Sequence, residues 1–578
     1  MLDHMKVGII GGGISGLLAA WHVSTTHPDT QVTVFDADER VGGKLRQEVI
    51  AGHAVDVGAE SALWRRPEVV ALLAELGVDS VHPQRFPAML WSRGSLEALP
   101  AGTLMGIPSD PHAAAGLLDD AEVARAADER AVSLTLDDAE ADISVGDAVE
   151  QALGSAVVDR MVEPLLGGVY AGHARELSTR ACVPALYAAL RAGTPLTQAA
   201  AAASSAVSSN DARQVFGAPA GGMGSLPEKL REALDARGVA IRTGATVTDL
   251  RRALAHRAGW HVEVDVEGLP EPHTFDAVVL ATPAPVTARL LADLAPAAAD
   301  AIAEIEYASM AIVTYAFDSA VAQQLPQGTG FLVPPVDGRT IKASTFSASK
   351  WAWVRRASDE VVLLRASAGR AGEVAALQRD DDELVAAVVA DVADLLDLDR
   401  PEPLQTALVR WGGGLPQYLV GHRGRVAAVR AAVAEVPGLE VAGAAFDGVG
   451  VPACIRDAKV DGRITLAGND VRITPDTPQL AQAQGAVTFS DTGFALQDTR
   501  VRLLGGEARF WGGTQANGAA GAPSVLLRAV GTASADWYVK DRELIDAVGK
   551  KGSTDTGSLQ GKLYGMRVQG SAYNPTEN

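Results

Sequence analysis

The amino-acid sequence predicts an α/β fold that opens with a parallel sheet and continues into helical and mixed regions. Three observations within residues 7–61 support this prediction: an apolar run that leads into a glycine-rich turn, a second apolar run that ends in a carboxylate, and paired glycines soon afterwards. This order of strand, turn, helix and strand is typical of the first unit of a doubly wound sheet.

The glycine-rich turn follows residues 6–10, a run that we interpret as a buried strand, and a helical pattern begins directly after it. Glycines at this spacing permit a tight turn, bring the backbone close to a pyrophosphate and let the helix pack against the strand. The free N–H groups at the start of that helix attract phosphate. The turn consists of Gly11, Gly12, Gly13, Ile14, Ser15 and Gly16.

The second apolar run, residues 31–35, leads into Asp36, which lies 20 residues after Gly16. A carboxylate at this point binds the ribose 2′-hydroxyl of a dinucleotide and disfavours a 2′-phosphate. Residues 40–45 follow, with a basic residue before paired glycines, and residues 56–61 add another glycine turn. Paired glycines suit a second close approach to the same dinucleotide, although alone they are compatible with an ordinary turn. In this order they favour FAD over NAD.

Five further segments extend the pattern along the chain. With them, the chain resembles the amine-oxidase and protoporphyrinogen-oxidase flavoprotein superfamily, and within it the porphyrinogen-oxidase branch, over about residues 5–457. General amine oxidases share the first and last regions of this resemblance and lack the middle set. The segments are 99–108 (LPAGTLMGIP), 163–172 (EPLLGGVYAG), 330–334 (GFLVP), 411–418 (WGGGLPQY) and 442–452 (AGAAFDGVGVP).

The resemblance implies FAD as the cofactor and assigns its contacts motif by motif. It implies that Val247 pairs its backbone with the adenine. Gly450 would open a helix N-terminus that stabilises negative charge on the reduced flavin. The assigned residues are Gly11, Gly12, Gly13, Ile14, Ser15, Gly16, Asp36, Arg40, Gly43, Lys44, Gly58, Ala59, Glu60, Ser61, Val247, Ala444, Val449, Gly450 and Val451.

The reaction that the resemblance implies is stepwise removal of hydride from the saturated bridges of a porphyrinogen, with oxygen reoxidising the flavin and releasing hydrogen peroxide. The type suggested is the soluble Gram-positive or actinobacterial coproporphyrinogen III oxidase of haem biosynthesis, which implies handover of the product to a ferrochelatase-type enzyme. No catalytic acid–base pair is assigned, because the flavin carries the redox chemistry.

A wide, apolar substrate pocket with cations for the propionates is expected. The candidate cations are Arg65, Arg66 and Lys342, and an ordinary surface charge is the alternative for each. The candidate wall residues are Phe331, Leu332 and Met310. His173 stands where the family usually has an acid. Drift at a surface position and altered substrate binding are both open explanations.

The composition of the chain indicates which binding partners and which cellular compartment to expect. The formal net charge of −21 argues against nucleic acid, which basic surfaces attract. Only two cysteines are present, far apart in sequence, which favours a reducing cytoplasm and no disulfide framework. We expect no transmembrane segment and no metal site. The sequence does not predict an oligomeric state.

The expected domains are interleaved along the chain. We assign residues 5–95, 216–295 and 431–457 to the FAD-binding domain. Residues 96–215 form a largely helical insertion, and together with 296–430 they form the mixed α+β substrate domain. A tail, 458–578, completes the chain.

The tail differs in composition from the rest of the chain. Five of the ten lysines fall after residue 454, and alternating short strands are expected from 462 to 513. This stretch resembles, weakly, the β-rich repeats of AsmA-like envelope proteins, and partial disorder is expected in the last forty residues. A native appended module, a frameshift, a misassembled gene and a constructed fusion all stay open, and a recent or artefactual join is favoured.

Three functions are kept open by the sequence. The first is the coproporphyrinogen III oxidase, with protoporphyrinogen IX oxidase as the alternative substrate preference. The second is a sister flavoenzyme, an amine oxidase or carotenoid-type desaturase, which the middle motifs disfavour. The third is a non-catalytic fusion of a damaged flavoprotein with an envelope protein.

Overall fold

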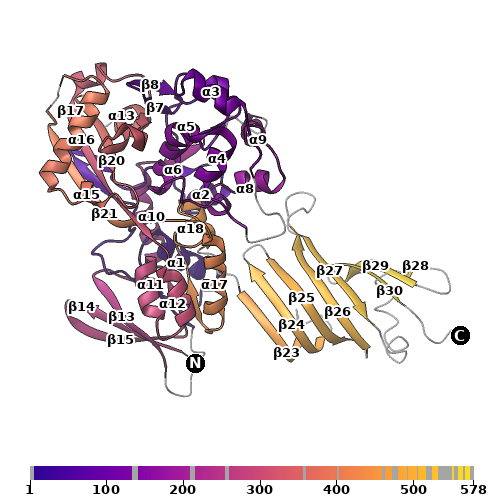
Figure 1. The fold of residues 1–578 in the computed structure, drawn as a ribbon. Helices are drawn as coiled ribbons and strands as arrows, with labels where there is room; N and C mark the ends of the chain where they lie inside the picture. The colour runs from indigo at the N-terminus through magenta and orange to yellow at the C-terminus, as the bar shows by residue number, and fades with distance from the viewer. Residues whose placement is uncertain are drawn as a thin grey trace. The chain divides into compact units, whose positions relative to one another are not determined.

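The computed structural model describes residues 5–132, 141–208, 215–253, 259–355, 360–399 and 402–457, together with strands between residues 462 and 572. The chain forms two compact units, Met1–Ala458 and Lys459–Asn578. Figure 1 shows the helices and strands of both units.

The first unit is built on a five-stranded sheet in which all neighbouring strands are parallel. Its strands come from three separate stretches of the chain, and β1 lies at its centre. The strand at residues 277–280 thereby returns to pair directly with the first strand of the chain. In sheet order the strands are β12 (Ala240–Arg242), β2 (Gln31–Phe35), β1 (Lys6–Ile10), β16 (Ala277–Leu280) and β22 (Leu439–Val441).

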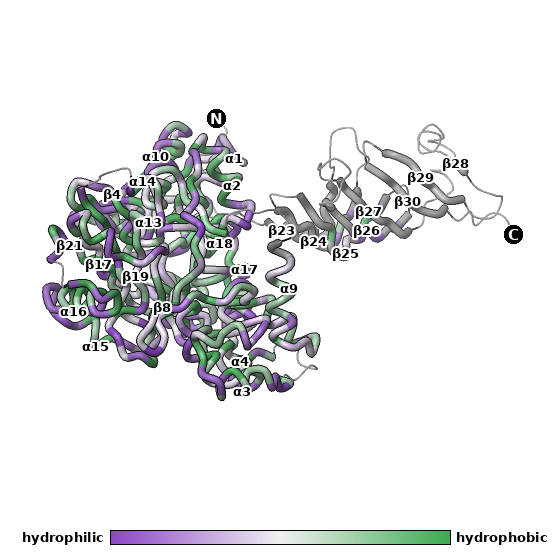
Figure 2. Tube along the Cα trace, turned by 90° about the horizontal axis from the view of Figure 1, so that it is seen from above, coloured by the Kyte–Doolittle hydropathy of each residue, from purple (hydrophilic) through white to green (hydrophobic). Residues whose placement is uncertain are grey.

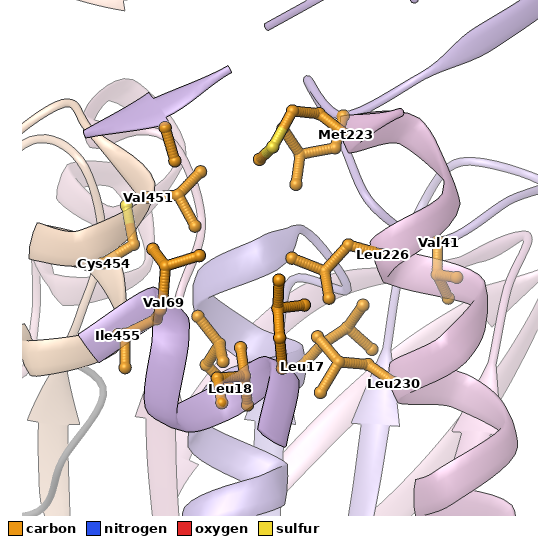
Figure 3. Close-up of a cluster of buried hydrophobic side chains, with 14 of the residues drawn as sticks. Leu17, Leu18, Val41, Val69, Met223, Leu226, Leu230, Val451, Cys454 and Ile455 are labelled. Atoms are coloured by element: carbon orange, nitrogen blue, oxygen red, sulfur yellow. The ribbon is translucent and has the colours of Figure 1, made fainter. Parts of the chain in front are cut away.

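Each face of the parallel sheet is covered, so its strands are apolar on both sides. On one face, Ile9 and Val34 join a core with helices α1 (Ile14–Thr26), α10 (Leu226–Asp235) and α18 (Val451–Asp457). Figure 3 shows side chains of these helices pointing toward one another: Leu17, Leu18, Leu226, Leu230, Val451, Cys454 and Ile455.

On the opposite face, Ile10, Phe35 and Leu280 join a second core. Successive strand residues point to opposite sides, which is why Ile9 and Ile10 enter different cores. This core lies under an antiparallel sheet and three helices: β13 (Ala245–Arg252), β14 (Trp260–Val266), β15 (Leu269–Phe275), α11 (Ala284–Leu291), α12 (Pro296–Ala303) and α17 (His422–Ala434).

A mixed seven-stranded sheet forms the other large layer of this unit, and α16 (Asp381–Leu395) packs on it. Its antiparallel strands are extended at one edge by a parallel pairing of β18 with β7. In sheet order the strands are β21 (Gln405–Pro416), β17 (Tyr307–Asp318), β20 (Val361–Ala368), β19 (Ile341–Phe346), β18 (Gly330–Leu332), β7 (Met89–Ser92) and β8 (Ser95–Ala98).

A helical region between residues 111 and 208 has its own core. Its elements are η1 (Pro111–Ala114), α3 (Asp120–Ala127), α4 (Val145–Leu153), α5 (Ser155–Val157), η2 (Val158–Val162), α6 (Glu163–Tyr170), α7 (Thr179–Cys182), α8 (Pro184–Arg191) and α9 (Leu196–Ser208). Hydrophilic stretches lie at the periphery of the first unit in Figure 2, for example near α3 and α16.

Short elements connect these layers. The strands are β3 (Gln47–Ile50), β4 (His53–Asp56), β5 (Ala62–Leu63), β6 (Ser80–Val81), β9 (Thr103–Leu104), β10 (Ile107–Pro108) and β11 (Phe216–Pro219). The helices are α2 (Pro67–Glu75), η3 (Met223–Ser225), η4 (Ser319–Gln323), η5 (Pro335–Asp337), α13 (Ser347–Lys350), α14 (Ala352–Arg355) and α15 (Val374–Leu377).

The second unit contains one sheet of eight strands, whose first five pair antiparallel in chain order. Within the last forty residues, where partial disorder is expected, the structure describes three short strands, and the other residues there lie outside the described part. The strands are β23 (Gly462–Val471), β24 (Leu480–Ser490), β25 (Gly493–Leu503), β26 (Gly506–Gln515), β27 (Ser524–Gly531), β28 (Lys550–Lys551), β29 (Gly557–Leu563) and β30 (Met566–Ala572).

The predicted fold class is confirmed: a parallel nucleotide-binding sheet is combined with a mixed sheet and a helical region. The domain boundaries stay a prediction, as does the foreign origin of residues 458–578. The last helix of the resemblance region, α18, is present, and it packs against α1 and α2 with Cys454 and Ile455 buried.

Candidate functional site

The glycine-rich turn lies at the carboxyl end of β1 and leads straight into α1. Gly11 has φ of +106°, which favours glycine, and a Cβ on Gly16 would lie 1.8 Å from the carbonyl oxygen of Gly11. Gly13 is the N-cap of α1, with no side-chain hydrogen bond, and a Cβ on it would meet nothing within 4 Å. Open space therefore borders Gly13 at the N-terminus of α1, the end of a helix that attracts phosphate.

Asp36 is fixed beside this turn. Its Oδ2 accepts a hydrogen bond of 2.6 Å from Gly12 N, and its Oδ1 accepts one of 2.8 Å from Asp38 N. Burial raises the pKa of Asp36 above its ordinary value. The carbonyl oxygen of Asp36 accepts from Ala245 N at 2.8 Å, which places the start of β13, and with it Val247, next to the carboxylate. The side chain of Val247 is buried, and β13 is an edge strand.

The second loop, residues 40–45, touches the first loop, which is the glycine-rich turn of residues 11–16, through backbone atoms. Gly42 forms a parallel bridge with Gly13, and a Cβ on Gly43 would lie 3.3 Å from the Cα of Gly13. Arg40 donates to the carbonyl oxygen of Gly43 at 3.2 Å, so it braces the loop. Lys44 follows, and although part of its side chain is exposed, burial of its ammonium lowers its pKa.

The third loop, residues 56–61, packs against the second. A Cβ on Gly58 would lie 2.0 Å from the carbonyl oxygen of Lys44. Glu60 forms ion pairs with Lys350 and with Arg365, the latter at 3.4 Å. Burial would raise the pKa of Glu60, but these two cations outweigh burial and lower it. Within this loop, Ala59 is exposed and Ser61 is half-buried.

The segment before α18 borders the glycine turn. A Cβ on Gly443 would lie 4.0 Å from Ser15 Oγ, and the neighbouring Ala444 accepts a 2.6 Å hydrogen bond at its carbonyl oxygen from Tyr418 Oη. Val449 is half-buried against the core of the helical region, Gly450 is exposed, and Val451 begins α18. The structure therefore brings the predicted cofactor-binding segments together from three distant parts of the chain.

Three of the predicted substrate residues meet at one end of the seven-stranded sheet. Lys342 on β19 donates a 2.8 Å hydrogen bond from Nζ to the carbonyl oxygen of Gly369, directly after β20. Val333, next to Leu332, donates from its backbone to the carbonyl oxygen of Lys342, and Met310 lies near the corresponding end of β17. Lys342 is buried, and this burial, reinforced by Arg370, lowers its pKa to about 7.

The structure places the predicted substrate residues in different environments. Phe331 and Leu332 point to opposite faces of the sheet, because successive strand residues alternate. Phe331 is 3% exposed and packs against Phe346, whereas Leu332 packs against the helical region. Lys342 is buried, so the alternative of an ordinary surface charge does not apply to it. Arg65 and Arg66 are both exposed, in the turn before α2.

His173 is bonded on both sides of its ring. Its Nδ1 lies 2.9 Å from Glu163 Oε1, and its Nε2 lies 3.0 Å from the carbonyl oxygen of Ala371. Glu163 is buried and also accepts from Ala174 N at 2.6 Å. The hydrogen bond with Glu163 is the main cause that raises the pKa of His173 to about 9. His173 therefore joins the start of α6 to the loop after β20, which drift at a surface position does not explain.

Two residues to which the sequence assigned no role at the cofactor hold the third loop in place. Arg365 on β20 donates to the carbonyl oxygens of Asp56 and Gly58, at 2.9 and 3.1 Å. Trp411 on β21 donates from Nε1 to the carbonyl oxygen of Val57 at 3.0 Å. The available signal was a charged residue inside the apolar strand pattern of residues 361–368, because a charge in such a strand requires a partner.

The described residues contain neither a candidate membrane-spanning helix nor a candidate metal site. Across that part of the chain, none of the helices is long and apolar enough to cross a membrane. The same residues contain no group of three or more His, Cys, Asp or Glu side chains arranged to hold a metal ion.

Comparison with known proteins identifies relatives of this chain. The family described as flavin containing amine oxidoreductase matches residues 14–459. A coproporphyrinogen III oxidase of Mycobacterium leprae is 39% identical over 454 residues, which covers 78% of this chain and 96% of that protein. A coproporphyrinogen III oxidase of Bacillus subtilis is 30% identical and covers 79% of this chain and 97% of that protein.

A solved structure gives the same result for the fold. A crystal structure from Exiguobacterium sp. 255-15 that bears the name protoporphyrinogen oxidase has a TM-score of 0.67 and 30% sequence identity to this chain. It covers 79% of this chain and 97% of that one. The matched family is flavin containing, which supports FAD as the cofactor, and the cradle formed by the three loops and α1 is the candidate site for it.

The cradle predicts different outcomes for two glycine substitutions. Gly13→Ala should leave the thermal unfolding midpoint of the apoprotein unchanged, because its Cβ would meet no atom within 4 Å. The added methyl group occupies space that the pyrophosphate needs, so the dissociation constant for FAD should rise at least about tenfold, or about 1.4 kcal/mol. Fluorescence titration of the apoprotein with FAD measures this change.

Gly16→Ala is the matched control. Its Cβ would lie 1.8 Å from a backbone oxygen, so we expect it to destabilise the apoprotein itself. Wild-type affinity for FAD in the Gly13→Ala variant would contradict the assignment of the cradle.

The raised pKa of His173 predicts that the stability of the folded protein depends on pH. A histidine whose pKa rises on folding to about 9 contributes stability that is complete below its unfolded pKa of about 6.5. That contribution is lost as the pH rises through 9, because the folded state then loses the extra bound proton. The thermal midpoint should therefore fall between pH 6.5 and 9, and fall less in His173→Gln. Equal falls in wild type, His173→Gln and the exposed-residue control His27→Gln would contradict this role.

Proposed function

The chain belongs to the flavin containing amine oxidoreductase family, and from this premise we propose that it oxidises coproporphyrinogen III to coproporphyrin III. The single observation that carries the proposal is the cofactor cradle, in which loops from three parts of the chain meet at the start of α1. The coproporphyrinogen III oxidases that resemble this chain over nearly their full length support the choice of substrate.

The residues of the chain hold the cofactor by backbone and charge. The N–H groups of α1 and the glycine turn bind the pyrophosphate, and Asp36 accepts a hydrogen bond from the ribose. Lys44 adds a positive charge beside the same loops. A bound FAD would supply the hydride acceptor for the porphyrinogen, and its reoxidation by oxygen would release hydrogen peroxide.

The residues for the substrate lie where the seven-stranded sheet ends. Leu332 and Met310 supply apolar surface, and α6 packs close by: a Cβ on Gly168 would lie 3.5 Å from Leu332 Cδ2. Arg65 and Arg66 are exposed cations suited to propionates, whereas Lys342 already donates to Gly369. The protein's task there is to orient the macrocycle and exclude water, and no acid–base pair is assigned.

The wider role follows from the reaction. We place the protein in haem biosynthesis in the cytoplasm, consistent with its two unpaired cysteines. Its other partners would be oxygen and a ferrochelatase-type enzyme that receives the product. Protoporphyrinogen IX is the second candidate substrate, favoured by the name of the solved Exiguobacterium structure. A damaged, non-catalytic fusion is the outcome if the protein neither binds flavin nor turns over.

Coproporphyrinogen III should be the better substrate of the purified, FAD-bound protein. Under air, the rate at which porphyrin fluorescence rises should exceed that with protoporphyrinogen IX, and both should be followed against autoxidation without protein. Hydrogen peroxide should accumulate in proportion to porphyrin. A rate no higher than autoxidation with either substrate would contradict the proposal, and a clear preference for protoporphyrinogen IX would move it to the second candidate.

Arg65 provides a test of propionate binding. Arg65→Ala should raise KM for coproporphyrinogen III by about threefold to tenfold, because a charge-assisted hydrogen bond at an exposed site contributes about 1 kcal/mol. The turnover number should stay near that of wild type. Arg289→Ala, which removes an exposed arginine of α11, is the control. Equal KM values for the two variants would remove Arg65 from the substrate site.

A further inference from the structure

Three consecutive carbonyl groups of the third loop are all held by side chains of the seven-stranded sheet. Arg365 donates from Nη1 to the carbonyl oxygen of Asp56 at 2.9 Å and from Nη2 to that of Gly58 at 3.1 Å. Trp411 donates to the carbonyl oxygen of Val57, which lies between them. The planar fork of a guanidinium is suited to holding two acceptors at fixed positions.

Arg365 is itself held by an ionic pair at the same place. Its Nη1 lies 3.4 Å from Glu60 Oε2, and Lys350 bonds the other carboxylate oxygen of Glu60. The side chains of Glu60 and Arg365 are only 11% and 13% exposed. Removing one member of a buried ionic group leaves another charge uncompensated, so the three residues act as a unit.

The third loop is also bonded on the side that faces the start of α10. The carboxylate of Asp56 accepts hydrogen bonds from Met223 N at 3.0 Å and Gly224 N at 2.8 Å, just before α10. A Cβ on Gly58 would lie 2.0 Å from the carbonyl oxygen of Lys44, and 3.4 Å from Trp411 Cζ2. The third loop is therefore held between the second loop and the seven-stranded sheet.

We propose that Arg365, held by Glu60 and Lys350, is a positioning residue that fixes the backbone of residues 56–58 and thereby the surface that the third loop presents to bound FAD. The inference rests on the proposed function, in which residues 58–61 contact the cofactor. Arg365 acts through the loop and touches neither cofactor nor substrate. A change at the seven-stranded sheet therefore reaches the third loop through this guanidinium as well as through Trp411.

The experiment compares two arginines of the same sheet that make the same kinds of bond. Arg410 on β21 also donates to two carbonyl oxygens, those of Leu377 and Arg379, and to the carboxylate of Asp381, but these acceptors lie away from the third loop. Arg365→Lys and Arg410→Lys each retain a positive charge and lose the fork. Both variants are compared with wild type as full-length, FAD-reconstituted protein.

The readouts are the dissociation constant for FAD, the visible absorption spectrum of the bound flavin and its midpoint potential. Arg365→Lys should weaken FAD binding by about tenfold and shift both the spectrum and the potential, and Arg410→Lys should change none of the three. Glu60→Gln, which removes the charge that orients Arg365, should shift the spectrum and potential in the same direction; this variant decides the question if Arg365→Lys does not fold.

Two results separate this inference from the function on which it rests. If wild type binds FAD and oxidises a porphyrinogen, but Arg365→Lys and Glu60→Gln match Arg410→Lys in all three readouts, the positioning role is overturned and the proposed function stands. If wild type binds FAD but oxidises neither porphyrinogen, the proposed function fails, while a selective shift in Arg365→Lys still supports the positioning role. A wild type that binds no FAD overturns both.

Discussion

The close backbone contact between the start of α1 and the end of β1 is the constraint on which the rest of the structure depends. A side chain at Gly16 would collide with the carbonyl oxygen of Gly11, so the helix can approach the strand only because that position is glycine. This approach seats Leu17 and Leu18 in the core that also receives α10 and α18. It also aims the free N–H groups of the helix at the space above Gly13.

The cofactor cradle depends on the whole first unit because its parts are distant in sequence. The second loop bridges the glycine turn, the third loop packs on the second, and the segment at Gly443 closes beside Ser15. The third loop is in turn bonded to β20 and β21 of the seven-stranded sheet. The cofactor and substrate regions are therefore joined by specific hydrogen bonds, and a cofactor that binds the assembled cradle will stabilise the folded unit.

The sequence predicted the parallel sheet and the cradle loops, because glycine spacing and apolar runs report on local backbone geometry. It did not predict which groups Arg365 and Trp411 bond, because their acceptors lie 309 and 354 residues away in the chain. The sequence named Phe331 and Leu332 as wall residues without showing that strand alternation directs them to opposite faces of the sheet. It left open whether Lys342 is a substrate cation or a surface charge, because burial in the folded unit is not visible in the sequence.

A crystal structure of the FAD-bound protein would show where the cofactor lies relative to the three loops. We expect the pyrophosphate above Gly13, within hydrogen-bonding distance of the first N–H groups of α1, and the ribose against Asp36. We also expect residues 56–61 to contact the cofactor with their carbonyl groups still bonded to Arg365 and Trp411. FAD bound elsewhere, or a third loop that leaves these two side chains when FAD binds, would contradict this arrangement.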